Sequence, residues 1–110
     1  AERAIQTYWP PNRGFLGTPN VETLKPGTII DRFGGPSGRF ASPKGTQFEM
    51  RSLPPEALEK PYIQYEVVKP IEVNAGKAAP WFGQPGLGTQ YEFSKSIQEL
   101  VDDGILRVVN

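Results

Sequence analysis

Glycine and proline interrupt this chain along its whole length. Its 110 residues include 12 Gly and 12 Pro, and Val, Ile, Leu and aromatic residues lie between these interruptions throughout. Disordered segments contain too few apolar residues to form a core, so the pattern is not typical of disorder. Short apolar runs separated by turn residues instead predict short strands joined by tight turns.

The apolar runs predict an α+β fold, in which a small, mostly antiparallel sheet carries few short helices. Residues 62–68 alternate and are rich in aromatic and β-branched side chains, which favours a strand. Ser96 and Glu99 have the spacing of a capping box, so we expect a helix that begins there and ends at Gly104. One or two helical turns are expected over residues 54–60, which begin with proline. The other expected strands are residues 28–33, 39–42, 71–73 as an extension or bend of 62–68, 89–93 and 105–109.

The length allows one domain, which we expect to span residues 1–110. Residues 1–17 are expected to be an N-terminal anchoring segment whose Tyr8, Trp9 and Phe15 pack on the core. No signal-peptide pattern opens the chain, and the start at Ala1 is abrupt. We therefore interpret the chain as a domain excised from a longer protein.

The composition excludes several kinds of site. The chain has no Cys and no His, so disulfides, thiolate ligands, cysteine nucleophiles and imidazole bases are absent. Nearly every zinc or copper site needs one of these residues, and we predict no metal site. The formal net charge is zero, which argues against non-specific nucleic-acid binding. No apolar run approaches the roughly 18 residues of a membrane span, so we expect neither nucleic acid nor a membrane as a partner.

Cationic side chains are concentrated in the first half of the chain. Residues 1–53 carry seven basic side chains against four acidic ones, and the remainder carries five against eight. Five of the first seven are Arg, whose planar fork suits phosphate and carboxylate groups. A random surface distribution is the simpler interpretation, and the asymmetry points to an anionic ligand only weakly.

Residues 30–40 place Arg32 at the end of an expected strand, beside a glycine-rich loop. An arginine fork and free backbone N–H groups in such a loop can hold a phosphate. Alternatively, Arg32 pairs with an acidic neighbour and the glycines merely turn the chain. The pattern is neither a dinucleotide fingerprint nor a P-loop, because no helix follows the glycines and the lysine is missing.

Two further segments carry candidate side chains. Arg51 lies where an extended stretch meets a helix N-terminus, and together with Arg32 it can straddle a diphosphate; an ordinary surface arginine is the alternative. In residues 79–92, Gln90 and Glu92 lie two apart on an expected strand and share one face, either toward a ligand or toward solvent. Two aromatic residues open this segment and are either core anchors or stacking partners: Trp81 and Phe82.

Taken in order, these segments resemble the TNT domain family, the NAD glycohydrolase toxins related to the tuberculosis necrotizing toxin. The resemblance extends from about residue 8 to residue 109. The strings that carry it are WPPNRGF (9–15), IDRFG (30–34), SGRF (37–40) with SP (42–43), RSLPP (51–55), YEVVKP (65–70), APWFGQPG (79–86), GTQY (88–91) and DGILR (103–107).

The resemblance implies a small ADP-ribosyltransferase-like fold and hydrolysis of NAD⁺, and often NADP⁺, to nicotinamide and ADP-ribose. Members are commonly C-terminal domains of large secreted bacterial toxins, and fungal surface enzymes share the fold. The implied substrate is thus NAD(P)⁺ with no further cofactor, and the implied partner is a cognate immunity protein. The implied location is that of a secreted or delivered effector that depletes NAD⁺ in the cytosol of a target cell.

By motif position, the resemblance makes Gln90 and Arg51 the catalytic residues. Arg32 becomes a second phosphate-side arginine, and Phe40 the aromatic residue that packs on the substrate. Some relatives carry a His just before the Tyr-x-Val strand, where this chain has Ile63 and Gln64. We interpret this departure as showing that the reaction needs no histidine.

The residue inventory is compatible with this reaction, because nicotinamide leaves as a neutral group and needs no general acid. The bond breaks through an oxocarbenium-like state, as in glycoside hydrolysis. We expect a metal-independent hydrolase with a shallow pH profile. Trp81 or Phe82 can assist in stacking, and Arg39 or Lys44 can accept the extra phosphate of NADP⁺, although the preference between the two substrates stays open.

Two other functions remain alternatives. An ADP-ribosyltransferase would use Glu92 as its catalytic glutamate, because Gln90-Tyr91-Glu92 resembles the Gln/Glu-x-Glu element of such enzymes. A non-catalytic binding module is favoured if Arg51 and Gln90 prove to be distant from each other.

Overall fold

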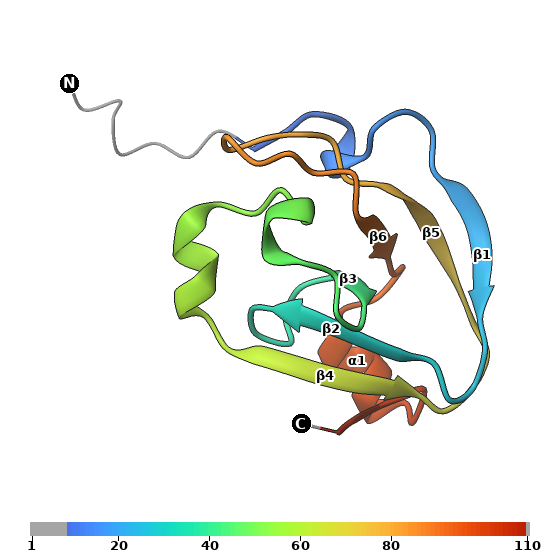
Figure 1. The fold of residues 1–110 in the computed structure, drawn as a ribbon. Helices are drawn as coiled ribbons and strands as arrows, with labels where there is room; N and C mark the ends of the chain where they lie inside the picture. The colour runs from blue at the N-terminus through green and yellow to red at the C-terminus, as the bar shows by residue number, and fades with distance from the viewer. Residues whose placement is uncertain (1–8, 110) are drawn as a thin grey trace.

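The computed structural model describes residues 9–109. Within this part of the chain, seven strands form one antiparallel sheet in the order β1-β5-β6-β3-β2-β4-β7 (Figure 1). The strands are β1 (Asn20–Leu24), β2 (Ile29–Phe33), β3 (Phe40–Pro43), β4 (Tyr62–Val67), β5 (Ile71–Lys77), β6 (Thr89–Glu92) and β7 (Leu106–Val108). The helices are the α-helix α1 (Ile97–Asp102) and the 3₁₀ segments η2 (Asn12–Gly14), η3 (Phe48–Met50) and η4 (Pro55–Glu59). None of these helices is long and apolar enough to cross a membrane.

Strand β3 joins the two halves of the sheet. Its first residues, Phe40 and Ala41, pair with β6, whereas Ser42 and Pro43 pair with β2. The strands β1, β5 and β6 therefore lie on one side of β3, and β2, β4 and β7 on the other. This arrangement brings the Gln90 strand and the Arg32 strand to the same short central strand.

The core lies between the sheet and α1. In the second half of β4, partly buried residues alternate with buried ones, and Tyr65 and Val67 point into the core. Helix α1 contributes Ile97 and Leu100 to the same cluster. Burial of these side chains supplies the main driving force for folding. In Figure 1, α1 lies behind β2 and β4.

Most of the predicted elements are confirmed. The α+β class and the mostly antiparallel sheet are confirmed, and five of the predicted strands match β2, β3, β4, β6 and β7 within a residue or two. The capping box is present, because Ser96 Oγ accepts from the Glu99 amide at 3.1 Å and Glu99 Oε1 accepts from the Ser96 amide at 3.0 Å. Residues 54–60 form 3₁₀ turns rather than an α-helix. The stretch 71–73 belongs to a separate and longer strand, β5.

One strand was missed, and one anchoring residue was predicted wrongly. Strand β1 was not predicted, because four of its five residues are exposed and only Leu24 is buried, so its sequence lacks a core-facing pattern. Phe15 is buried as expected, but Trp9 is exposed and does not anchor the segment on the core. Tyr8 lies outside the described residues.

Candidate active site

A cavity of about 430 Å³ opens where β2, β3 and β6 meet. The N-terminal segment forms a second wall, and the chain from Arg51 to Lys60 forms a third. Arg32, Phe40, Arg51 and Gln90, which are four of the predicted site residues, all line this cavity. Residues far apart in the sequence are thus brought together, and Glu92 lies with them.

Arg32 reaches the cavity from the end of β2. Its Nη1 donates to the Phe40 carbonyl at 2.6 Å, and its Nε lies 3.4 Å from the Gly34 carbonyl. The loop backbone packs directly on the guanidinium, since a β-carbon at Gly38 would lie only 2.4 Å from Arg32 Nη2. Glycine at position 38 is therefore what allows the loop to cover this side chain.

Within residues 9–109, no carboxylate lies at ion-pair distance from Arg32. The guanidinium is partly buried, and this burial lowers the pKa of Arg32 from its ordinary value. A half-buried cation without a protein counter-ion is costly unless an anionic ligand completes it. The acidic neighbour Asp31 pairs with Arg51 instead.

Arg51 is buried and most of its donors bind protein atoms. Its Nη2 lies 2.8 Å from Asp31 Oδ1, and its Nε and Nη2 donate to the Thr46 carbonyl at 2.9 and 2.7 Å. The guanidinium also stacks on the ring of Phe33, 4.9 Å from its centroid. Only Nη1 of Arg51 has no acceptor among the described residues, so this nitrogen is its one free donor.

Asp31 is the centre of this buried network. Its Oδ2 accepts from Tyr62 Oη at 2.6 Å and from the Gly45 amide at 3.1 Å. Burial, followed by the hydrogen bond to Asp31, raises the pKa of Tyr62. Tyr62 therefore stays protonated and donates to the carboxylate.

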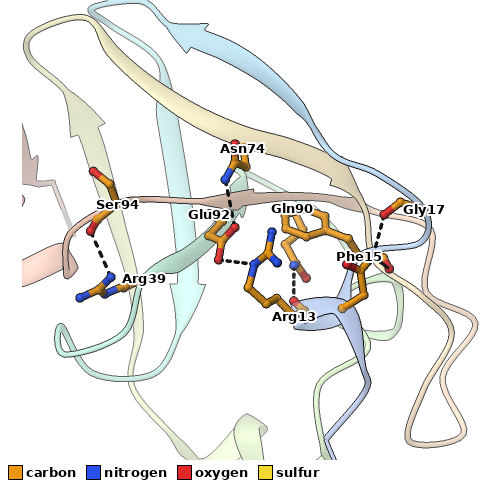
Figure 2. Close-up of polar contacts among 9 residues, drawn as sticks. Arg13, Phe15, Gly17, Arg39, Asn74, Gln90, Glu92 and Ser94 are labelled. Carbon is orange, nitrogen blue, oxygen red and sulfur yellow. Dashed lines mark hydrogen bonds and ion pairs between the residues drawn. The ribbon is translucent and has the colours of Figure 1, made fainter.

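Gln90 and Glu92 project from the same face of β6 toward the N-terminal segment (Figure 2). Gln90 Nε2 donates to the Arg13 carbonyl at 3.0 Å. Because that carbonyl can only accept, the amide orients its Nε2 to it, and its Oε1 has no donor among the residues that the structure describes. Glu92 Oε2 pairs with Arg13 Nε at 2.7 Å, and its Oε1 accepts from Asn74 Nδ2 at 3.2 Å. Both carboxylate oxygens of Glu92 are thus occupied by side chains of the protein.

The backbone that carries Arg13 is left-handed. Asn12 and Arg13 have φ values of 57° and 52°, which are uncommon for residues with a side chain. Asn12 supports this turn, because its Nδ2 donates to the carbonyls of Phe15 and Gly17 at 3.0 and 2.7 Å. The turn directs the Arg13 side chain to Glu92 and its carbonyl to Gln90.

Three predicted binding residues do not line the cavity: Arg39, Trp81 and Phe82. Arg39 is exposed and donates to the Ser94 carbonyl at 3.1 Å, at a second and more open hollow of about 550 Å³. Phe82 instead packs edge-on against Trp9, with ring centroids 5.4 Å apart. Lys44, the other candidate for the extra phosphate, is exposed outside the cavity.

Several other lining residues were not predicted as site residues, among them Trp9, Arg13, Phe33 and Lys60. Trp9, Arg13 and Phe33 lie inside the strings that carry the family resemblance, so the strings themselves contained a signal for them. Lys60 follows a short 3₁₀ segment and has no motif around it. No cluster of three or more acidic side chains that could hold a metal occurs in the described part of the chain.

The family model described as tuberculosis necrotizing toxin (TNT) matches residues 23–109. This chain belongs to the TNT family. The match covers strands β2 and β6, which carry Arg32 and Gln90, and the turn after η3 that carries Arg51, whereas the N-terminal wall of the cavity lies before it.

Similar proteins agree with this assignment. The chain is 41% identical over 115 residues to the conidial surface nicotinamide adenine dinucleotide glycohydrolase of Aspergillus fumigatus, covering 92% of this chain and 49% of that protein. This chain thus spans about half the length of its fungal relative. The structure of tuberculosis necrotizing toxin complexed with its immunity factor IFT matches with a TM-score of 0.75 and 28% identity, over 93% of this chain and 62% of that one. Tse6, solved in complex with Tsi6, matches with a TM-score of 0.53 and 22% identity over 83% of this chain and 71% of that one, which shows a shared fold.

Proposed function

We propose that this chain is an NAD⁺ glycohydrolase that cleaves the nicotinamide–ribose bond of NAD⁺ and yields nicotinamide and ADP-ribose. The observation that carries the proposal is Arg32, a cation without a counter-ion among residues 9–109, which lines one cavity with Gln90, whose amide oxygen has no donor in the same part of the chain. The TNT family and the name of the fungal relative support the same activity. NADP⁺ is proposed as a second substrate.

In this proposal, Arg32 binds the diphosphate, because an arginine fork matches phosphate oxygens and no carboxylate of the described residues competes for it. Arg51 contributes its free Nη1 and keeps Phe33 and Asp31 in place. Phe40 packs on the nicotinamide. The cavity thereby holds the substrate with its reacting bond near β6, which is the positioning that such a reaction requires.

Gln90 is proposed as the residue at the reacting carbon. Its Nε2 is fixed by the Arg13 carbonyl, and the free Oε1 can accept a hydrogen bond from a ribose hydroxyl or from the attacking water. A fixed dipole beside a developing oxocarbenium ion stabilises it without reorganisation. Nicotinamide leaves as a neutral molecule, so the chain needs no general acid for this step.

Hydrolysis is favoured over transfer by the state of Glu92. A transferase of the Gln/Glu-x-Glu type uses this carboxylate to bind the substrate, but here Arg13 and Asn74 already donate one hydrogen bond to each of its oxygens. The binding-module alternative requires Arg51 and Gln90 to be far apart, and both line the same cavity. We therefore propose an enzyme rather than a binding module, in which Glu92 positions Arg13.

We further propose a secreted or delivered effector that acts in the cytosol of a target cell and has a cognate inhibitor. The solved TNT structure includes an immunity factor, which supports such a partner. The fungal relative is named as a conidial surface protein, which supports a location at the cell surface as a second possibility for this chain. Lys60 lines the cavity, unlike Arg39 and Lys44, and is our revised candidate for the extra phosphate of NADP⁺.

The test is to incubate the purified chain with NAD⁺ and EDTA, and to measure nicotinamide and ADP-ribose with and without acceptor proteins. We expect equal amounts of both products without an acceptor. Nicotinamide release that requires an acceptor, with ADP-ribose bound to it, would instead establish a transferase. A folded protein that acts on neither NAD⁺ nor NADP⁺ would disprove the proposed activity.

A further inference from the structure

The side-chain amide of Gln90 can adopt two orientations, which exchange its oxygen and its nitrogen. In the structure its Nε2 donates to the Arg13 carbonyl at 3.0 Å. The reversed orientation would set Oε1 against this carbonyl, and two acceptors cannot form a hydrogen bond with each other. The Arg13 carbonyl therefore selects the orientation in which Oε1 is left to accept a hydrogen bond from a ligand.

The position of this carbonyl depends on how Arg13 itself is held. Its backbone is left-handed, with a φ of 52°, a conformation that persists where surrounding contacts compensate for the strain. The side chain supplies one such contact, because Arg13 Nε lies 2.7 Å from Glu92 Oε2 on strand β6. Gln90 lies two residues before Glu92 on the same strand. Strand β6 thus binds Arg13 at two points, its side chain through Glu92 and its carbonyl through Gln90 (Figure 2).

Glu92 is fixed from the other side by strand β5. Asn74 stands opposite Glu92 in the pairing of β5 with β6, and its Nδ2 donates to Glu92 Oε1 at 3.2 Å. With one oxygen bound by Asn74, the carboxylate presents the other to Arg13. The contacts from Asn74 to Glu92 and from Glu92 to Arg13 therefore form a chain that ends at the Gln90 amide.

The rest of the N-terminal segment is anchored without this ion pair. Phe15 is buried and packs on Gly76, where a β-carbon would lie 3.0 Å from Phe15 Cδ1. The Leu16 amide donates to the Lys77 carbonyl at 2.8 Å. Loss of the ion pair should therefore displace the turn at Arg13 while the segment itself stays on the sheet.

We infer that Arg13 and Glu92 are positioning residues of the reaction, which together set the orientation of the Gln90 amide. Asn74 supports the same arrangement by holding Glu92. The inference rests on the proposed function, because it assumes that Gln90 Oε1 acts at the reacting bond. It gives the N-terminal wall a part in turnover, although this wall precedes the residues that the family model matches.

The first test is Glu92→Gln, which keeps the size of the side chain and removes its charge. We expect kcat for NAD⁺ to fall about tenfold with KM nearly unchanged, because a small displacement at a reacting centre lowers turnover. Arg13→Lys keeps a cation opposite Glu92 and should retain most of the turnover, whereas Arg13→Ala should lose as much as Glu92→Gln. Glu66→Gln is the matched control and should have wild-type kcat, since Glu66 pairs with the exposed Arg107 and neither residue lines the cavity.

The decisive variant combines Glu92→Gln with Gln90→Ala. If Glu92 acts through Gln90, the double variant should be no slower than Gln90→Ala alone, because the effects of residues that act as a unit are not additive. A general loss of structure would instead slow both backgrounds alike. A loss equal to the product of the two single losses would overturn the inference, and so would wild-type kcat in Glu92→Gln.

A spectroscopic measurement separates this inference from the proposed function. The side-chain amide of Gln90 is assigned in heteronuclear NMR spectra as the signal that Gln90→Ala lacks. In Glu92→Gln its chemical shift should move toward the values of solvent-exposed glutamines. An unchanged Gln90 amide would overturn the inference whether or not the chain hydrolyses NAD⁺. If the amide moves but the wild type acts on neither NAD⁺ nor NADP⁺, the proposed activity is wrong, while the positioning of Gln90 by Arg13 and Glu92 is supported.

Discussion

Two arginines in the walls of the cavity each pair with a carboxylate, but their surroundings differ. The side chains of Arg51 and Asp31 are 5% and 0% exposed, whereas those of Arg13 and Glu92 are 51% and 16% exposed. The distances of 2.8 and 2.7 Å are nearly the same. Two ion pairs of nearly equal length are therefore expected to contribute differently to stability.

Burial explains the difference. The wall that contains Arg51 and Asp31 is called the inner wall here. Its two charges are buried, and hydrogen bonds to Thr46, Gly45 and Tyr62 help the ion pair offset the cost of desolvation. Removing one partner of such a pair leaves an uncompensated charge. In the N-terminal wall, water can replace either partner, so Arg13 positions neighbouring groups more than it stabilises the fold. The inner wall therefore stabilises the fold, whereas the N-terminal wall positions side chains of the site.

The largest expected effect concerns Asp31. Asp31→Ala should lower the free energy of unfolding by about 3–5 kcal/mol, because Arg51 keeps a buried charge without a partner. Urea unfolding followed by circular dichroism measures this value. Glu92→Ala is the matched variant in the other wall and should lose less than about 1 kcal/mol. Equal losses in the two variants would remove the distinction between the walls.

Gln90 tests the N-terminal wall as part of the site. Gln90→Ala should lower kcat by roughly 100-fold or more, the usual effect of removing one preorganised transition-state contact, with little change in thermal stability. Nicotinamide release at saturating NAD⁺ measures it. Gln98→Ala, an exposed glutamine on α1, is the control and should have wild-type turnover. Full activity in a folded Gln90→Ala protein would reject the assigned role.

Arg32 tests what an arginine without a carboxylate partner does, in contrast to the two paired ones. Arg32→Ala should raise KM for NAD⁺ by roughly 10- to 100-fold, as expected for a lost hydrogen bond to a charged group. The melting temperature should also fall, because the hydrogen bond to the Phe40 carbonyl is lost, although no ion pair within the described residues is broken. Arg107→Ala, at the far edge of the sheet, serves as the exposed control. An unchanged KM in Arg32→Ala would exclude phosphate binding by this side chain.

Tyr62 sharpens the account of the inner wall. Tyr62→Phe should cost about 1 kcal/mol, because it removes one hydrogen bond to Asp31 and leaves the Gly45 amide in place. Since the pKa of Tyr62 is raised in the fold above its ordinary value of 10.0, its contribution is fully present below pH 10 and is lost as pH rises above it. Unfolding measured at pH 8 and at pH 11 should therefore show a smaller difference between wild type and Tyr62→Phe at pH 11. The same difference at both pH values would contradict this linkage.

The smallest effect is expected from salt. The exposed Arg13–Glu92 pair should be screened at high ionic strength, whereas the buried Arg51–Asp31 pair should not. Coupling energies from double-mutant cycles at 0.05 and 1 M NaCl measure both. We expect the coupling energy of the Arg13–Glu92 pair to fall by a few tenths of a kcal/mol at high salt, and that of the Arg51–Asp31 pair to stay unchanged. A salt-sensitive inner pair would show that water reaches it.

Local patterns were sufficient for much of the fold. Alternating residues predicted β4, and the capping box predicted the start of α1, because these signals act between residues close in sequence. Strand β1 escaped prediction, since its pairing with β5 stabilises it rather than its own burial pattern. A pairing partner some fifty residues away leaves no mark on the sequence of an edge strand.

By itself, the sequence determined most of the strands, the helix start at Ser96 and the order of strings that identify the TNT family. It also indicated Arg32, Phe40, Arg51 and Gln90, which the fold brings to one cavity. Only the tertiary structure decided the pairing, because Asp31 and Arg32 are adjacent, yet Asp31 pairs with Arg51 whereas Arg32 meets no carboxylate within residues 9–109. Likewise, only the fold places Trp9 rather than Phe82 at the rim. Side chains on neighbouring residues point to different surroundings, and contacts between distant residues decide what each one meets.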